Sequence, residues 1–156
     1  MQAHFLTLQT ERTQLVLELP PGSYPHILYW GPALTHTSAE QLAVLTTRQW
    51  VHGGAAVDLA PSLSNELGLG VSAAPGFLAH RLGTEWAAVF CVREVKQLAA
   101  NAVRIVCADN NTQLQAVYEL SLDADTHVLS ATTSIVNLGE APLVIDWCTA
   151  LCLPLD

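Results

Sequence analysis

One turn-rich segment of the sequence carries four side chains that could bind a polar ligand: Glu66, His80, Arg81 and Trp86. A carboxylate, an imidazole and a guanidinium can exchange hydrogen bonds or protons with a substrate. The glycines and the proline between residues 66 and 81 restrict the backbone to a defined shape. The same composition also fits an ordinary connecting loop, because glycine and proline mark most loops.

The acidic residues form no evident catalytic pair. Glycosidases normally use two carboxylates about 5–10 Å apart. Asp109, Asp123 and Asp125 lie beside turn residues, where aspartate commonly accepts hydrogen bonds from nearby backbone. Asp146 lies in an apolar stretch next to Trp147, and we expect it to face outward from a strand. The sequence also lacks a nucleophile elbow and a phosphate-binding loop.

Neither a metal site nor a cofactor is indicated by the histidines and cysteines. None of the six histidines forms a His-x-His or His-x-x-x-His pair. On one strand, Cys148 and Cys152 would lie about 13 Å apart, too far for a single zinc ion. All four cysteines fall in apolar runs, so we expect buried free thiols rather than disulfides: Cys91, Cys107, Cys148 and Cys152.

The order of residues in the segment resembles the N-terminal domain of bacterial α-galactosidases of glycoside hydrolase family 36. The resemblance lies in the acid-Leu-Gly-x-Gly start at Glu66, the centre Pro75-Gly76-Phe77, the pair His80-Arg81, and Trp86. It extends over nearly the whole chain, since the Tyr29-Trp30-Gly31 turn and residues 134–155 are also similar to the family.

This resemblance implies an all-β fold for residues 1–156: all or part of an antiparallel β-sandwich of the supersandwich type found in galactose mutarotases. It implies that the catalytic (β/α)₈ barrel belongs to the full-length enzyme and is absent here, so we expect the chain alone to be inactive. It further implies that the loop contributes to oligomer assembly and shapes the sugar pocket near a neighbouring subunit. Glu66, His80 and Arg81 are the polar candidates there, with Trp86 behind them.

Two other functions remain open. A stand-alone carbohydrate-binding module would stack sugar rings on exposed aromatic side chains, for which the candidates are Tyr29, Trp30, Trp50, Trp86 and Trp147. Each tryptophan lies in or beside an apolar run, where burial is the usual outcome. A purely structural interaction protein is consistent with the low charge but leaves the loop pattern unexplained.

The composition limits partners and location. The 156 residues suit one domain, and 51% are hydrophobic while only 13% are charged, against about 25% in ordinary domains. We therefore expect an apolar surface covered in a homo-oligomer or by further domains. A net charge of −8 disfavours binding to nucleic acid or to an anionic membrane. No apolar run approaches the roughly 20 residues of a membrane helix, and residues 1–4 lack signal-peptide features, so we expect a cytoplasmic protein.

The elements that would position the segment are mostly strands. Alternation with a two-residue period and intervening turns predict strands at 15–19, 26–30, 86–92, 95–99, 102–108, 114–122, 128–136 and 143–153. Their spacing indicates an antiparallel sandwich or barrel. One short helix is expected from Ser38 to about Thr47, where Ser38 and Gln41 form a capping box.

Overall fold

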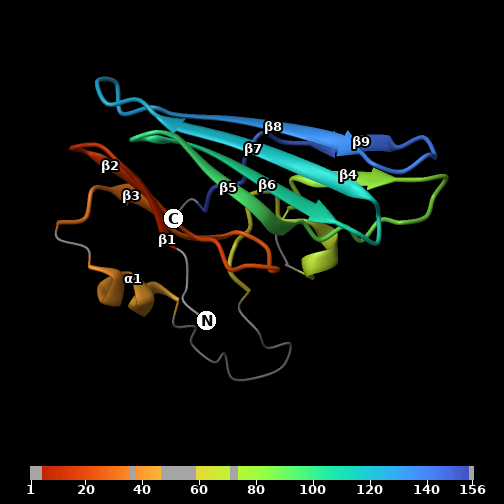
Figure 1. The fold of residues 1–156 in the computed structure, drawn as a ribbon, viewed down its shortest axis with the longest axis horizontal. Coiled ribbons are helices and arrows are strands. Elements are labelled where there is room, and N and C mark those ends of the chain that lie inside the picture. The colour runs from red at the N-terminus through yellow and green to blue at the C-terminus, as the bar shows by residue number, and fades with distance from the viewer. Residues whose placement is uncertain (1–4, 36–37, 47–58, 71–73, 155–156) are drawn as a thin grey trace.

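Two antiparallel sheets lie face to face in the computed structural model, which describes residues 5–35, 38–46, 59–70 and 74–154. The first sheet has the order β1-β2-β3, with β1 at Phe5–Gln9, β2 at Thr13–Glu18 and β3 at His26–Pro32. The second has the order β5-β6-β7-β8 and runs through Cys91–Ala99, Ala102–Asp109, Leu114–Leu122 and Leu129–Asn137. A separate pair joins β4, Phe77–His80, to β9, Val144–Cys148 (Figure 1).

The core lies between the two sheets. Strand β7 alternates between buried and exposed residues in its second half, where Tyr118 and Leu120 are buried while Glu119 and Ser121 face solvent. Buried leucines of β1 and β2 join these side chains in one hydrophobic cluster. A face of alternate residues that is apolar can be buried only against a second apolar face. The predicted all-β antiparallel sandwich is therefore confirmed.

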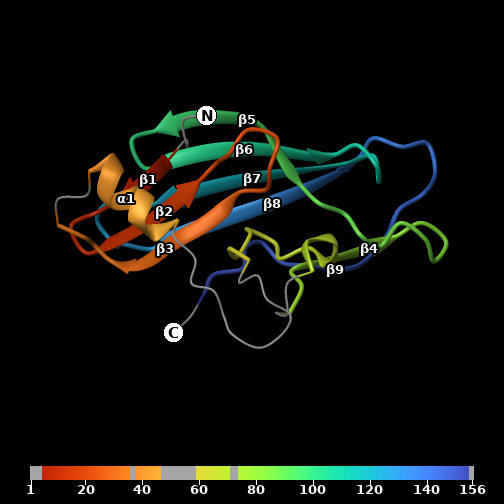
Figure 2. The same cartoon turned by 90° about the horizontal axis from the view of Figure 1, so that it is seen from below.

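Helix α1, Ala39–Leu45, lies against the outer side of the three-stranded sheet (Figures 1 and 2). The Ser38 hydroxyl accepts a hydrogen bond from the Gln41 amide at 3.3 Å, and Gln41 Oε1 accepts one from the Ser38 amide at 2.8 Å. Leu42, a residue of this helix, is buried. Both the helix and its capping box are as predicted, and α1 is the one α-helix in the described ranges.

The predicted strands at 86–92 and 95–99 are wrong in their division, because a single strand, β5, covers 91–99. Residues 85–90 lie outside the sheets. Glu85 has a positive φ of 61°, which an extended strand does not permit. The amide of Val89 donates to the Asp109 carboxylate at 3.3 Å instead of to a neighbouring strand. Local backbone geometry and a side-chain acceptor thus override the apolar pattern.

The last predicted strand, 143–153, is too long, because β9 ends at Cys148. Beyond it the Thr149 amide donates to Gly76 O and the Cys152 amide to Leu63 O, both at 2.8 Å. All four cysteines are free, but only Cys107 is buried. Cys148 is exposed, as are the other residues of β9, so the prediction of uniformly buried thiols is wrong.

Candidate functional site

Glu66 is buried, with 1% of its surface exposed. Its carboxylate accepts hydrogen bonds from the hydroxyls of Ser62 at 2.7 Å and Ser64 at 2.9 Å. The Ser64 hydroxyl also lies 2.6 Å from the hydroxyl of Tyr118 on β7. No ion pair among the described residues involves Glu66. Its role is to connect the loop that precedes β4 with the core of the four-stranded sheet.

Burial and hydrogen bonding act on Glu66 in opposite directions. Desolvation raises the pKa of Glu66 above its ordinary value, and the hydroxyls of Ser62 and Ser64 offset part of that rise. The pKa of the Tyr118 phenol is raised well above its ordinary value, mainly by burial and next by the nearby Glu66. Sugar contact by Glu66 would require access that this packing does not provide.

Arg81 also faces inward, and its guanidinium is surrounded by protein oxygens. It donates to two backbone carbonyls and two side chains: Thr112, Ala141, Asn137 and Glu85. Thr112 belongs to the β6–β7 turn, while Asn137 ends β8 and Ala141 lies in the β8–β9 turn. Four of the five guanidinium N–H groups are thereby used. Arg81 holds three turns together at one end of the molecule and has little capacity left for a ligand.

A tight hairpin turn presents His80 and Trp86 on the outside. The backbones of Arg81 and Thr84 exchange two hydrogen bonds of 2.9 Å. Leu82 and Gly83, at the tip, have φ values of +50° and +80°, as the mirror-image turn of two-residue hairpins requires. Trp86 Nε1 donates to Gly83 O at 2.8 Å, and its ring lies 4.5 Å from the His80 ring between centroids.

Strand β9 adds two side chains beside this hairpin. His80 Nε2 lies 3.6 Å from Asp146 Oδ2. Trp147 is paired with Leu78 of β4. Trp86 is 45% exposed and Trp147 is 55% exposed, so the expected burial of both tryptophans is wrong. Trp30 does pack against the core, and Trp50 lies outside the described residues.

The four predicted site residues therefore fall into two groups. Glu66 and Arg81 point into the protein, whereas His80 and Trp86 lie at the surface with Asp146 and Trp147. No described hydrogen bond joins Glu66 to any of the other three. The sequence offered Asp146 and Trp147 only as isolated candidates. Their position beside His80 depends on the pairing of β9 with β4, which the apolar pattern did not predict.

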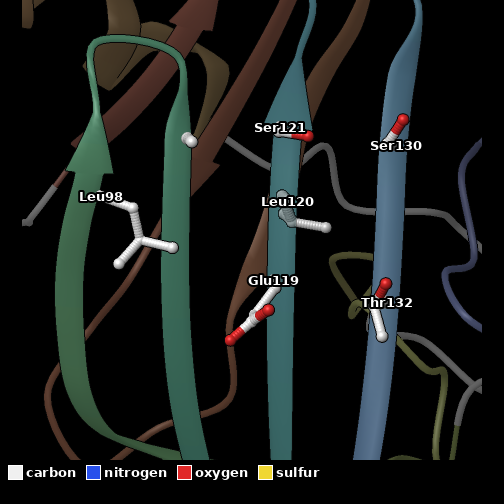
Figure 3. Close-up of a pocket in the computed structure, with 7 residues that line it drawn as sticks. Leu98, Glu119, Leu120, Ser121, Ser130 and Thr132 are labelled. Carbon is white, nitrogen blue, oxygen red and sulfur yellow. The ribbon is translucent and has the colours of Figure 1, made fainter.

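A shallow recess of about 210 Å³ lies elsewhere, on the outer face of the four-stranded sheet. Figure 3 shows Leu98, Glu119 and three hydroxyl side chains around it. Glu119 is already 3.8 Å from Arg104, and no aromatic side chain lines the recess. Across the described ranges no three histidine, cysteine or acidic side chains are grouped to hold a metal ion. No helix there is long and apolar enough to cross a membrane.

The sandwich is shared with solved α-galactosidases. The α-galactosidase from Lactobacillus brevis superimposes with a TM-score of 0.77 at 15% identity, over 96% of this chain and 23% of that one. The galactosidase domain of an α-galactosidase-sucrose kinase gives 0.77 at 17% identity, over 96% and 24%. The family 36 α-galactosidase AgaA from Geobacillus stearothermophilus gives 0.74 at 13%, over 95% and 24%. At these identities the likeness defines the fold alone.

The chain belongs to the glycosyl hydrolase family 36 N-terminal domain family, whose sequence model matches residues 23–156. It is 29% identical over 147 residues to an α-galactosidase from Escherichia coli. That alignment covers 94% of this chain and 20% of the relative. The chain thus spans about a fifth of the curated relative and about a quarter of the solved structures, and the family inferred from the loop residues is confirmed.

Proposed function

We propose that this chain is the accessory N-terminal domain of an α-galactosidase, which removes terminal α-galactosides as the full-length enzyme. The observation that carries the proposal is the family match over residues 23–156, supported by the Escherichia coli relative. The catalytic carboxylates would lie in the (β/α)₈ barrel of the full-length enzyme. The 156 residues alone would therefore hydrolyse no α-galactoside. A cytoplasmic location remains a prediction from the composition.

The reading frame that encodes this chain tests the proposal. We expect it to continue past Asp156 into a barrel, and its whole product to release nitrophenol from a nitrophenyl α-galactoside. The 156-residue chain should release none. A frame that stops at Asp156, or hydrolysis by the short chain that is lost in Glu66→Gln, would contradict the proposal.

We infer a second role for the domain in assembly. The segment from Glu66 to Arg81, extended by its hairpin tip, would lie at or near the interface of a homo-oligomer and shape the sugar pocket of a neighbouring subunit. Support comes from Leu67 and Leu82, which are both exposed apolar side chains in this region.

Light scattering on the full-length product should show a dimer or a larger assembly. Leu82→Asp places a charge at the tip and should shift the assembly toward monomers, whereas Leu98→Asp, on the distant sheet face, should not. A monomer at micromolar concentration would contradict the assembly role and leave the α-galactosidase assignment intact.

A further inference from the structure

We propose that the outward face of the β4–β9 pair binds a pyranose ring of a glycoside. The ring would stack on Trp147, with Trp86 as a second aromatic contact, and one hydroxyl would bridge His80 and Asp146. The site belongs to the domain itself and needs no catalytic barrel. It therefore goes beyond the proposed accessory role.

The register of the pair places these side chains on one face. Trp147 lies opposite Leu78, and directly paired residues project to the same side of a sheet. His80 follows Leu78 by two positions, so it shares that side. The ring contact with Trp86 brings that side chain to the same face as His80. The register shifts between Leu78 and Ala79, which leaves Asp146 without a paired residue. Asp146 therefore does not follow the alternation of the strand, and its Oδ2 lies 3.6 Å from His80 Nε2. In Figures 1 and 2 the pair lies far from α1, at the end where the β8–β9 turn projects.

The spacing of His80 and Asp146 suits a bridging hydroxyl better than a direct hydrogen bond between the two side chains. The Gly83 amide donates to His80 Nδ1 at 3.0 Å, so in the neutral ring the proton is on Nε2. The distance of 3.6 Å from Nε2 to Asp146 Oδ2 exceeds a normal hydrogen bond. An oxygen about 2.8 Å from both atoms could accept from Nε2–H and donate to the carboxylate. A hydroxyl does both, as a water molecule also does, whereas a methyl group, a carbonyl or a cation cannot.

The chemistry of the face favours a sugar among possible occupants. Pyranose rings carry C–H groups on one face, which pack on indole, and hydroxyls at the edge, which suit a donor–acceptor pair. Asp146 is 44% exposed, and among the described residues its side chain makes no other ion pair or hydrogen bond. The turn that carries His80 and Trp86 is fixed by its own hydrogen bonds. A ligand would therefore meet side chains that are already ordered, which lowers the entropic cost of binding.

The test is a titration of the 156-residue chain with methyl α-D-galactopyranoside and, separately, with methyl α-D-glucopyranoside. Nuclear magnetic resonance would follow the four indole N–H signals. We expect either sugar to shift the signals of Trp147 and Trp86 saturably, with weak affinity, while that of Trp30, which packs against the core, stays fixed. The choice of galactoside as first probe rests on the proposed function; the glucoside arm makes the site testable without it.

Two substitutions at exposed positions should weaken binding about tenfold or more, equivalent to about 1.4 kcal/mol: Trp147→Ala and Asp146→Ala. Glu119→Ala removes a carboxylate of comparable exposure, 53% against 44% for Asp146, from the recess of Figure 3 and should leave binding unchanged. Trp147→Phe retains a smaller aromatic ring, so its affinity for the sugar should lie between that of the parent chain and that of Trp147→Ala. An intermediate affinity separates lost stacking from lost folding.

The proposal is overturned if neither sugar shifts either indole signal, or if Glu119→Ala weakens binding as much as Asp146→Ala. It is also overturned if the chain forms an oligomer whose indole signals shift with neither sugar and Trp147→Ala dissociates that oligomer. The face would then be a protein interface. Each of these results leaves hydrolysis by the full-length product unaffected, so failure of this inference and failure of the proposed function are distinguishable.

Discussion

The hydroxyl of Tyr118 lies 2.6 Å from the hydroxyl of Ser64, although the two residues are 54 positions apart. Through Ser64 the contact continues to the buried carboxylate of Glu66. A loop that precedes β4 is thus anchored in the centre of strand β7. Buried polar groups of this kind are stable only while each keeps its partner.

Removing the Tyr118 hydroxyl should destabilise the domain. Tyr118→Phe leaves Ser64 without that partner, and we expect the free energy of unfolding to fall by about 1–2 kcal/mol in urea titrations. Tyr29→Phe is the matched control, because the Tyr29 hydroxyl donates to Pro32 O at 2.6 Å in an exposed setting. The interpretation fails if the two variants lose the same free energy.

Glu66→Gln should change how stability depends on pH. Burial raises the folded-state pKa of Glu66, so folded protein holds that proton more tightly than unfolded protein. The resulting stability is present below the ordinary pKa of about 4.5 and is lost as pH rises through the raised value. Measured by urea titration from acid to neutral pH, the variant should gain stability relative to the parent as pH increases.

Asp123→Asn should change the pH dependence of stability in the opposite direction to Glu66→Gln. Hydrogen bonds from Thr126 lower the pKa of Asp123, so its contribution is present above its ordinary pKa and is lost as pH falls through the lowered value. The free energy of unfolding of this variant should fall furthest below that of the parent at neutral pH and approach it in acid. Parallel pH curves for Glu66→Gln and the parent would show that Glu66 does not titrate differently on unfolding.

Arg81→Lys should be far more damaging than a conservative exchange suggests. An ammonium cannot reproduce the fork that reaches Thr112 O and Asn137 Oδ1 together. We expect a loss of about 2 kcal/mol or more in urea titrations, since buried acceptors are left unpaired. Arg104→Lys, at an exposed pair with Glu119, should cost less than about 0.5 kcal/mol. A similar small loss at both positions would contradict the buried role of Arg81.

Leu82→Asn should stabilise the domain. Leu82 is 96% exposed and has a φ of +50°, a conformation that costs most residues about 1–2 kcal/mol and asparagine less. Thermal and urea unfolding should therefore show a gain of up to about 1 kcal/mol. Leu138→Asn is the control, because Leu138 is also exposed but does not have a positive φ. A loss of stability in Leu82→Asn would show that the leucine makes a contact worth more than its backbone strain.

The sequence was most informative where structure is local. Strand β7 was predicted with its observed bounds, because apolar residues recur at every second position from Leu114 to Leu122. The helix was predicted from Ser38 and Gln41, which contact each other directly. The order of the loop residues, together with similar segments over nearly the whole chain, also identified the family.

What could not be predicted depends on partners that are distant in the sequence. Strand β4 has four residues within a glycine- and proline-rich stretch, and it is defined only by its pairing with β9. Glu66 is linked through Ser64 to Tyr118 of β7, and Trp147 lies on a strand that pairs with β4. No periodicity near Glu66 or Trp147 carries this information.

The pairing of β4 with β9 also constrains the order in which the chain can fold. Strands β5 to β8 are joined as successive neighbours and can assemble as the polypeptide emerges from the ribosome, whereas Phe77–His80 must wait for residues 144–148. Closing this long interval is entropically costly and is expected to be late. In pulsed hydrogen exchange, amides of β4 should gain protection after those of β6 and β7. Simultaneous protection would indicate that the end carrying His80 and Trp147 forms together with the rest of the sandwich.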